Sequence, residues 1–310
     1  MLAICGGVGG AKLALGLQHH LGARLTVVVN IGDDFVHRGL KICPDIDTVL
    51  YTLGGLNDEQ KGWGRAGETW QFMEASRALG AESWFQLGDK DLATHVERTR
   101  RLAQGESLTV ITESFARSFG IQSRILPVTD DVVQTIVDTD IGQLEFQQYF
   151  VAHRCEPVVR KISFSGAGDA MLSSHVAAAF DDDSLSAIIL CPSNPYLSID
   201  PILAIPEFRR RLGNRRVPAV AISPIIGGKA VKGPTVKLMR ELGIPNTSRS
   251  IADHYRGLID GIVVDDGDTE EAAAIDVQVL ATPTLMNDDV SKRTLARQAI
   301  TFALELKRAV

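Results

Sequence analysis

Short runs of apolar, largely β-branched residues recur along the chain, and few polar side chains interrupt them. Such runs are typical of strands that are buried on both faces, as in a parallel sheet covered by helices. Helix-period patterns lie between several of the runs, which is the alternation of doubly wound α/β folds. The pattern predicts strands over residues 2–5, 25–29, 187–191, 217–222, 261–265 and 277–281, and helices over residues 11–21, 206–212, 234–242 and 250–259.

Two stretches depart from this alternation. From about residue 47 to 120 the apolar positions follow a helical period, over 68–79, 92–102 and 107–119, which predicts a helical insertion beside the sheet. From about 125 to 164, two alternating segments flank a turn at 140–142, which is typical of a β-hairpin. No repeat or Pro/Ser-rich linker divides the chain. We therefore expect one α/β domain over residues 1–310, a Rossmann-like three-layer αβα sandwich with a mostly parallel sheet and these two additions.

Composition narrows the class of protein. The 310 residues are 45% hydrophobic and 23% charged, as in an ordinary globular protein. The net charge of −6 disfavours binding through phosphate neutralisation, so we expect no nucleic-acid partner. No apolar run approaches the roughly 20 residues that span a bilayer, and no signal peptide is evident, so we expect a cytoplasmic protein without a membrane partner. The four cysteines form no C-x-x-C pair, which argues against zinc or redox chemistry.

A glycine cluster follows the first predicted strand, in the stretch GGVGGAKLALGL, and contains Gly6, Gly7, Gly9 and Gly10 with Lys12 behind them. A dinucleotide fingerprint started at Gly7 would need its third glycine where Lys12 stands, and Lys12 is followed by leucine rather than the serine or threonine of a P-loop. Glycine nevertheless lets a backbone approach an anion, and a helix start offers N–H groups. We expect this segment to bind a diphosphate; a tight strand-to-helix turn without a ligand is the alternative.

Carboxylates gather after the second predicted strand. The stretch NIGDDF supplies Asp33 and Asp34, and CPDIDT supplies Asp45 and Asp47. Ligands of open α/β sheets bind at the carboxyl ends of the strands, where we expect these residues to lie in loops. Because carboxylates repel a phosphate unless a cation intervenes, the pattern predicts Mg²⁺ as a cofactor.

Three further stretches carry candidate site residues. The stretch LGDKDLATH opens a predicted helix, where a helix cap or a surface ion pair is the alternative to a site. The stretches CPSNP and SPIIGGK follow later strands, and ordinary turn chemistry is the alternative there. Aromatic residues of the insertion are expected to be mostly core, with one ring free to stack on a flat ligand. These additional candidates are Asp89, Asp91, His95, Ser193, Asn194, Gly227 and Gly228.

Seven long stretches together resemble the CofD family, the 2-phospho-L-lactate transferases of coenzyme F420 biosynthesis. They are GGVGGAKLALGL, LTVVVNIGDDF, CPDIDTVLYTLGGL, GWGRAGETW, WFQLGDKDLATH, CPSNPYLSIDPILAIP and SPIIGGKAVKGP. They occur in the family's order and spacing from residue 1 to residue 286. The resemblance implies transfer of a phospho-three-carbon-acid group (lactyl, enolpyruvyl or glyceryl) from a guanosine diphosphate-type donor to a hydroxyl of the deazaflavin Fo, with release of GMP.

The same resemblance implies roles for individual residues. Asp47, the second aspartate of P-D-I-D-T, and Gln86 match the family's Fo contacts, although many relatives carry Lys or Arg at the position of Gln86. Asp33 and Asp45 are expected to bind Mg²⁺ or activate the hydroxyl, so that Asp33, Asp45 and Asp47 form the catalytic set. The glycines, Lys12 and the later polar loops would bind the donor. A homodimer is the expected assembly.

Part of this sequence pattern would also fit two other functions. A non-catalytic regulator that binds a nucleotide sugar would share the glycine opening and the aspartates after the second strand, but it would not need P-D-I-D-T or G-D-K-D-L-A-T-H. A nicotinamide-dependent oxidoreductase would need the third fingerprint glycine and an acidic residue near the position of Asn30. The sequence also predicts that replacing Asp47 with alanine abolishes transfer and leaves the fold intact.

Overall fold

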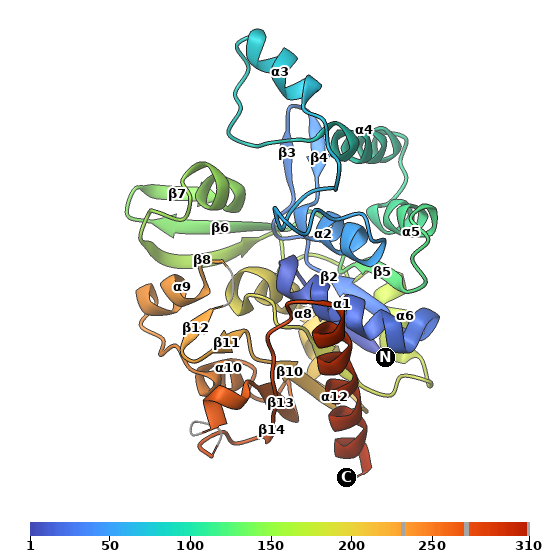
Figure 1. The fold of residues 1–310 in the computed structure, drawn as a ribbon, viewed down its shortest axis with the longest axis vertical. Coiled ribbons are helices and arrows are strands. Elements are labelled where there is room, and N and C mark those ends of the chain that lie inside the picture. Colours follow the sequence, from blue (N-terminus) through green and yellow to red (C-terminus); the bar gives the residue numbers. More distant parts are fainter. Residues whose placement is uncertain (231–232, 270–272, 309–310) are drawn as a thin grey trace.

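A seven-stranded, all-parallel sheet forms the centre of the protein in the computed structural model, which describes residues 1–230, 233–269 and 273–308 (Figure 1). The strand order is β14-β13-β10-β9-β1-β2-β5. Six strands confirm the predicted ones to within two residues at each end: β1 Leu2–Cys5, β2 Thr26–Val29, β9 Ile188–Leu190, β10 Ala219–Ile222, β13 Gly261–Val264 and β14 Gln278–Ala281. The seventh, β5 Arg124–Pro127, pairs with β2 at the sheet edge, so the start of the stretch predicted as a hairpin belongs to the main sheet instead.

Helices cover both faces of the sheet, which confirms the predicted three-layer α/β fold. The helices α1 Gly7–Leu21, α2 Pro44–Leu53 and α12 Asp289–Arg308 pack side by side on one face. Behind the sheet lie α6 Ser174–Asp181 and α8 Pro206–Gly213, whose Phe180 and Phe208 rings meet edge to face at 5.3 Å. Smaller helices complete the second half: α7 Asp200–Leu203, α9 Thr235–Glu241 and α10 Ser248–His254. The strand residues between the layers are almost fully buried, as expected for a parallel sheet.

The two additions project from one end of the sheet (Figure 1). The first contains the hairpin β3 Phe35–His37 and β4 Leu40–Ile42, followed after α2 by α3 Gln71–Ala78, α4 Asp89–Ala103 and α5 Leu108–Ser118. The second is a three-stranded antiparallel sheet in which β6 Gln134–Thr139 pairs with both β7 Gly142–Glu145 and β8 Val159–Ser165. The short hairpin β11 Ile225–Ile226 and β12 Lys229–Ala230 follows β10. Both additions therefore lie next to loops at the carboxyl edge of the main sheet.

Gly16 allows α1 and α12 to approach each other closely. A Cβ atom at this position would lie 2.2 Å from the carbonyl oxygen of Lys292 on α12. Replacing Gly16 with alanine is therefore expected to displace the α12 backbone and to lower the free energy of unfolding by about 1–3 kcal/mol. Urea unfolding would measure the loss. Gly213→Ala is the matched control, because a Cβ there would meet only a Leu258 methyl at 4.0 Å; equal stability of the two variants would contradict the packing argument.

Candidate active site

A cavity of about 650 Å³ opens at the carboxyl ends of the central strands. Segments that follow β1, β2, β9 and β10 line it, together with parts of both additions and the stretch from Thr284 to Met286. Its volume lies in the range of small-molecule sites, and its position is where ligands bind in open α/β sheets. The cavity brings together twelve of the predicted site residues: Gly6, Gly7, Gly9, Lys12, Asp33, Asp45, Asp47, Gln86, Asp91, His95, Ser193 and Asn194.

The glycine cluster is mostly the first turn of α1 rather than a loop before it. The helix begins at Gly7, four residues earlier than predicted, and Gly7 has a positive φ of 62°. The Gly7 N–H donates to Asp45 Oδ1 at 2.8 Å. Ser193 holds the preceding residue, since its hydroxyl accepts from the Gly6 N–H at 3.1 Å and donates to the Gly6 carbonyl at 2.6 Å. The first turn of the helix is thus fixed between α2 and the loop after β9.

Close packing explains why these positions carry glycine. A Cβ on Gly6 would lie 2.6 Å from Asp45 Oδ2, and one on Gly9 would lie 2.5 Å from the Pro192 carbonyl oxygen. A Cβ on Gly10 would lie 2.3 Å from Ser193 Oγ. The glycines therefore let a carboxylate and a neighbouring loop approach the helix start. The first N–H groups of a helix have no partner within it, and Val8 and Gly9, next in the turn, both line the cavity.

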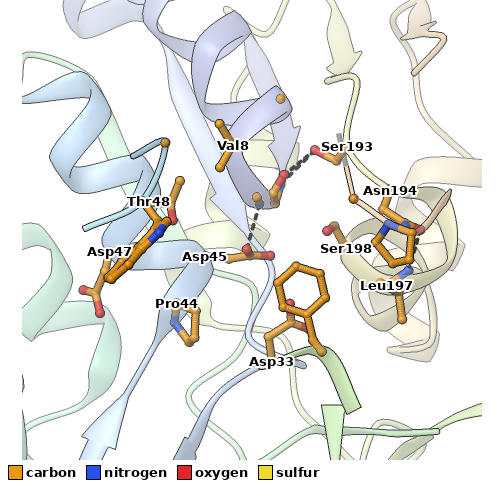
Figure 2. A pocket seen from close by; sticks show the side chains of 18 of the residues that line it. Val8, Asp33, Pro44, Asp45, Asp47, Thr48, Ser193, Asn194, Leu197 and Ser198 are labelled. Carbon is orange, nitrogen blue, oxygen red and sulfur yellow. Dashed lines mark hydrogen bonds between the residues drawn. The ribbon is translucent and has the colours of Figure 1, made fainter. Parts of the chain in front are cut away.

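Asp33 and Asp45 form a buried acid pair directly below this helix start (Figure 2). Asp45 accepts from Gly7 N–H and from Asn30 Nδ2 at 2.9 Å, whereas Asp33 Oδ1 is buried without a hydrogen-bond partner. Burial, and then the neighbouring Asp45 charge, raise the pKa of Asp33 well above its usual value. Burial also raises the pKa of Asp45 to about 6, against the hydrogen bonds from Asn30 and Gly7. A nearby cation would stabilise the ionised form of both carboxylates.

Without a bound metal ion, the raised pKa of Asp45 should make the stability of the protein depend on pH. Because the folded-state pKa of Asp45 is raised to about 6, its contribution to stability is present at low pH and is lost as the pH rises through 6. In EDTA, the unfolding free energy of wild type relative to Asp45→Asn is therefore expected to fall between about pH 4 and about pH 6.5, by about 1.4 kcal/mol per unit of pKa shift, and to stay level above that range. Urea titrations at several pH values would measure it. A difference that does not change with pH would contradict the raised pKa.

Asp47 does not join this pair, although the sequence grouped the three aspartates together. The prediction that Asp45 and Asp47 occupy a loop was wrong, because both lie in the first turn of α2. Residues two apart on a helix point to different sides, and Figure 2 shows the Asp47 carboxylate directed away from Asp33 and Asp45. Both Asp47 oxygens accept from the guanidinium of Arg98 on α4, one of them at 3.1 Å. Asp47 therefore belongs to a second polar cluster on the cavity wall.

This second cluster continues along α4. His95 Nε2 lies 3.2 Å from Asp91 Oδ2, and the other oxygen of Asp91 accepts from Tyr51 Oη at 2.6 Å. Hydrogen bonding and charge from His95 contribute to a lowered pKa of Asp91, although burial opposes them. Asp47, Asp91 and His95 each offer a ligand atom within 4.8 Å of the others, a spacing that a metal ion could use. However, the Arg98 guanidinium already neutralises Asp47, so among the described residues Asp33 and Asp45 are the better pair for Mg²⁺.

The remaining polar candidates have structural partners. Asp34 pairs with Lys41 at 3.2 Å and does not line the cavity. Asp89 is the first residue of α4 and does not cap that helix; its carboxylate instead accepts from the N–H groups of Gln71 and Phe72 at the start of α3. Asn194 accepts from the N–H groups of Tyr196 and Leu197 and caps the turn Pro195–Ile199. Such partners hold the loops in place around the cavity.

The remaining residues predicted to contact a substrate differ in whether they line the cavity. Lys12 Nζ donates to the Met286 carbonyl at 2.8 Å, which ties α1 to the stretch that crosses the cavity. Gln86 lines the cavity while its amide donates to the Ser83 carbonyl. Gly227 donates to the Asp268 carboxylate, and neither Gly227 nor Gly228 lines the cavity. A role for these two glycines in donor binding stays a prediction.

Aromatic rings form one wall of the cavity. Trp63, Trp84 and Phe85 line it, and Phe85 packs edge to face on Phe35 at 4.9 Å. Trp63 is 48% exposed, which sets it apart from the packed rings. The wall can accept a flat heterocycle.

Sequence reasoning missed several residues that build the site. Asn30 positions Asp45, and Arg98 positions Asp47; Ser198 and Thr48 also line or contact the pocket. Pro44 at the helix start, with acidic residues in the first turn, is a standard signal that would have found α2. Arg98 lies in the stretch ERTRR and carries no local signal that separates it from its exposed neighbours.

Within the part of the chain that the structure describes, no helix has both the length and the apolar character to cross a membrane.

Comparison with known proteins places the chain in a family. Residues 1–301 match the family model described as 2-phospho-L-lactate transferase CofD. A protein of Streptomyces griseus named phosphoenolpyruvate transferase is 39% identical, with 99% of each chain covered. Proteins of the same name from Thermobifida fusca and Mycolicibacterium smegmatis are 38% and 37% identical, with at least 97% of each chain covered.

Solved structures support the fold alone. Two crystal structures of a protein from Bacillus halodurans, a member of the UPF0052 family, share 12% and 13% of their residues with this chain. They cover 96% of it and 98% of their own length, with TM-scores of 0.62 and 0.64. The family match and the long relatives decide the assignment: the chain belongs to the CofD family and is a transferase of phosphate-containing groups that acts in coenzyme F420 biosynthesis.

Proposed function

We propose that the cavity transfers a phospho-three-carbon-acid group, with phosphoenolpyruvyl as the first candidate, from a guanosine diphosphate-type donor to the terminal ribityl hydroxyl of Fo. The observation that carries this proposal is the buried acid pair, Asp33 and Asp45, below the glycine-rich start of α1. The names of the relatives favour the enolpyruvyl group over the lactyl and glyceryl groups. An enzyme of this class needs a diphosphate site, a charge-neutralising centre and an acceptor site next to each other.

The donor diphosphate would lie at the start of α1. The unused N–H groups of the first turn and the positive end of the helix dipole favour an anion there. Lys12 lies one turn further along α1 and lines the same cavity. Ser193 and Asn194 hold the adjoining loop, and the stretch from Thr284 to Met286 borders the space left for the nucleoside.

Asp33 and Asp45 are suited to hold Mg²⁺. Their carboxylates are buried, Asp33 Oδ1 has no partner, and each oxygen is a hard ligand of the type Mg²⁺ prefers. When bound, Mg²⁺ would neutralise the diphosphate and stabilise the charge that develops on the leaving phosphate. Asn30 and the Gly7 N–H would keep Asp45 oriented in both states.

The proposed step is a displacement at phosphorus. The ribityl oxygen forms a bond to the phosphorus that carries the three-carbon acid, and the bond from that phosphorus to the bridging oxygen of GMP breaks. The hydroxyl proton passes to a carboxylate of the acid pair, and GMP leaves with the bridging oxygen. Positioning and charge neutralisation supply most of the rate in such transfers.

The acceptor would lie between the second polar cluster and the aromatic wall. Asp47 offers an acceptor for N–H or O–H groups, and Gln86 borders the same space. Trp63 and Trp84 offer flat apolar surfaces to the deazaflavin ring. In this arrangement the ribityl chain extends from the ring toward the acid pair.

A competition experiment tests the proposal. The purified chain is incubated with Fo, Mg²⁺ and equal amounts of the guanylated lactyl, enolpyruvyl and glyceryl donors, and the products are identified by mass spectrometry. The expected product is Fo joined to phosphoenolpyruvate, with an equal amount of GMP. A dominant lactyl or glyceryl adduct would overturn the donor assignment, and no adduct at all would overturn the function. A homodimer and a cytoplasmic location stay predictions, which light scattering and cell fractionation would measure.

A further inference from the structure

The side chain of Arg98 is fully buried on α4, although no part of it lines the cavity. Its guanidinium donates to both oxygens of Asp47, to the Lys41 carbonyl at 3.4 Å and to His95 Nδ1 at 3.2 Å. Burial opposes its charge, but the Asp47 carboxylate more than offsets this and raises the pKa of Arg98. All of these contacts come from the two terminal nitrogens, whereas Nε is buried without a partner, so the Asp47 carboxylate is the main compensation for the buried charge.

These contacts fix the direction of the hydrogen bonds in the second polar cluster. A guanidinium can only donate, so in the contact between Arg98 and His95 the accepting atom is His95 Nδ1. The other ring nitrogen, Nε2, faces Asp91 Oδ2 at 3.2 Å. Asp91 accepts from Tyr51 on its other oxygen. Asp47 and Asp91 are therefore held as acceptors.

We infer that Arg98 is a positioning residue for the binding of Fo. Its contact with both oxygens of Asp47 holds this carboxylate in an orientation in which it can accept a hydrogen bond from Fo. The inference rests on the proposed function, since it concerns the same cavity and the binding of Fo. Arg98 acts through Asp47, because Asp47 lines the cavity and Arg98 does not. The proposed donor site is at the start of α1, near the acid pair, so replacing Arg98 should leave donor binding unchanged.

The geometry favours this role over a metal site in the same cluster. A cation bound to Asp47, Asp91 and His95 would lie beside the positive guanidinium of Arg98, which also contacts His95 at Nδ1. An ionised carboxylate that is paired on both oxygens keeps further lone pairs for a ligand N–H or O–H. The charge and the direction of the donors thus match a hydrogen-bonding substrate.

The test replaces Arg98 with lysine, which keeps the charge and loses the fork. With wild type as reference, the KM for Fo is expected to rise about tenfold or more, while the KM for the guanylated donor stays within about twofold. Arg100→Lys is the matched control, because Arg100 lies two residues further on α4, is exposed and contacts Glu97 and Gln104 at the surface. An unchanged KM for Fo in a folded Arg98→Lys, or equal changes in both KM values, would overturn the inference.

A second comparison tests whether Arg98 acts through Asp47. In Asp47→Asn the carboxylate is already gone, so adding Arg98→Gln is expected to leave the KM for Fo unchanged. A further change of tenfold would show that Arg98 acts independently of Asp47 and would overturn the inference.

These experiments also separate the inference about Arg98 from the proposed function. Wild type that transfers nothing to Fo contradicts the proposed function, whereas active wild type with an indifferent Arg98 contradicts only this inference.

Discussion

Replacing Asp45 with asparagine is expected to lower the rate of transfer at least about 1,000-fold, while the protein stays folded. The change removes one charge from the acid pair and leaves an amide where Mg²⁺ is expected to bind, so that the diphosphate is no longer neutralised. The carbonyl of the new amide can still accept from the Gly7 N–H, which limits the structural damage. Quantifying the Fo adduct by mass spectrometry at saturating substrates measures the loss.

Asp169→Asn is the matched control for this variant. Asp169 is exposed and does not line the cavity, so the same chemical change there should leave the rate unaltered. Addition of Mg²⁺ at tenfold higher concentration should not restore Asp45→Asn to the control. If the two variants transfer at rates within tenfold of each other, the acid pair is not the charge-neutralising centre.

Replacing Asp47 with alanine is expected to cost about 3–5 kcal/mol of unfolding free energy as well as activity. The sequence alone predicts an intact fold for this variant. The structure revises that expectation, since alanine leaves the fully buried Arg98 guanidinium without its carboxylate. Urea unfolding in the absence of ligands would measure the loss.

The double variant Asp47→Ala with Arg98→Met tests the cause of this loss. Methionine fills much of the volume of arginine without a charge, so most of the lost stability is expected to return, whereas transfer to Fo stays impaired. An Asp47→Ala protein that unfolds at the same urea concentration as wild type would contradict the buried ion pair.

The strands of the main sheet were predictable because their signal is local. Each buried strand is a short β-branched run, and a parallel sheet needs little else to specify it. The exception is β5, which begins with Arg124 and ends with Pro127, and whose place at the sheet edge depends on pairing with β2 rather than on its own sequence. The carboxyl-edge rule then placed the glycines and Asp33 correctly.

The division of the site into two clusters could not be read from the spacing of the aspartates. Asp45 and Asp47 are two residues apart, and only the helical geometry of α2 sends one to the glycine turn and the other to α4. Arg98 is 51 residues from its partner Asp47, and its burial follows from how α4 packs against β4 and α5. Long-range packing of this kind leaves no mark on the local pattern.

The reaction that we propose for this cavity joins Fo to a phospho-acid and consumes a guanylated donor. The most direct measurement is a single-turnover reaction of the purified chain with equal amounts of Fo and the enolpyruvyl donor, quenched over time, with the adduct and GMP quantified together. We expect the Fo adduct and GMP to appear at the same rate and in equal amounts with Mg²⁺. We expect neither product in EDTA until Mg²⁺ is restored. Release of GMP without a matching Fo adduct, or full turnover in EDTA, would contradict it.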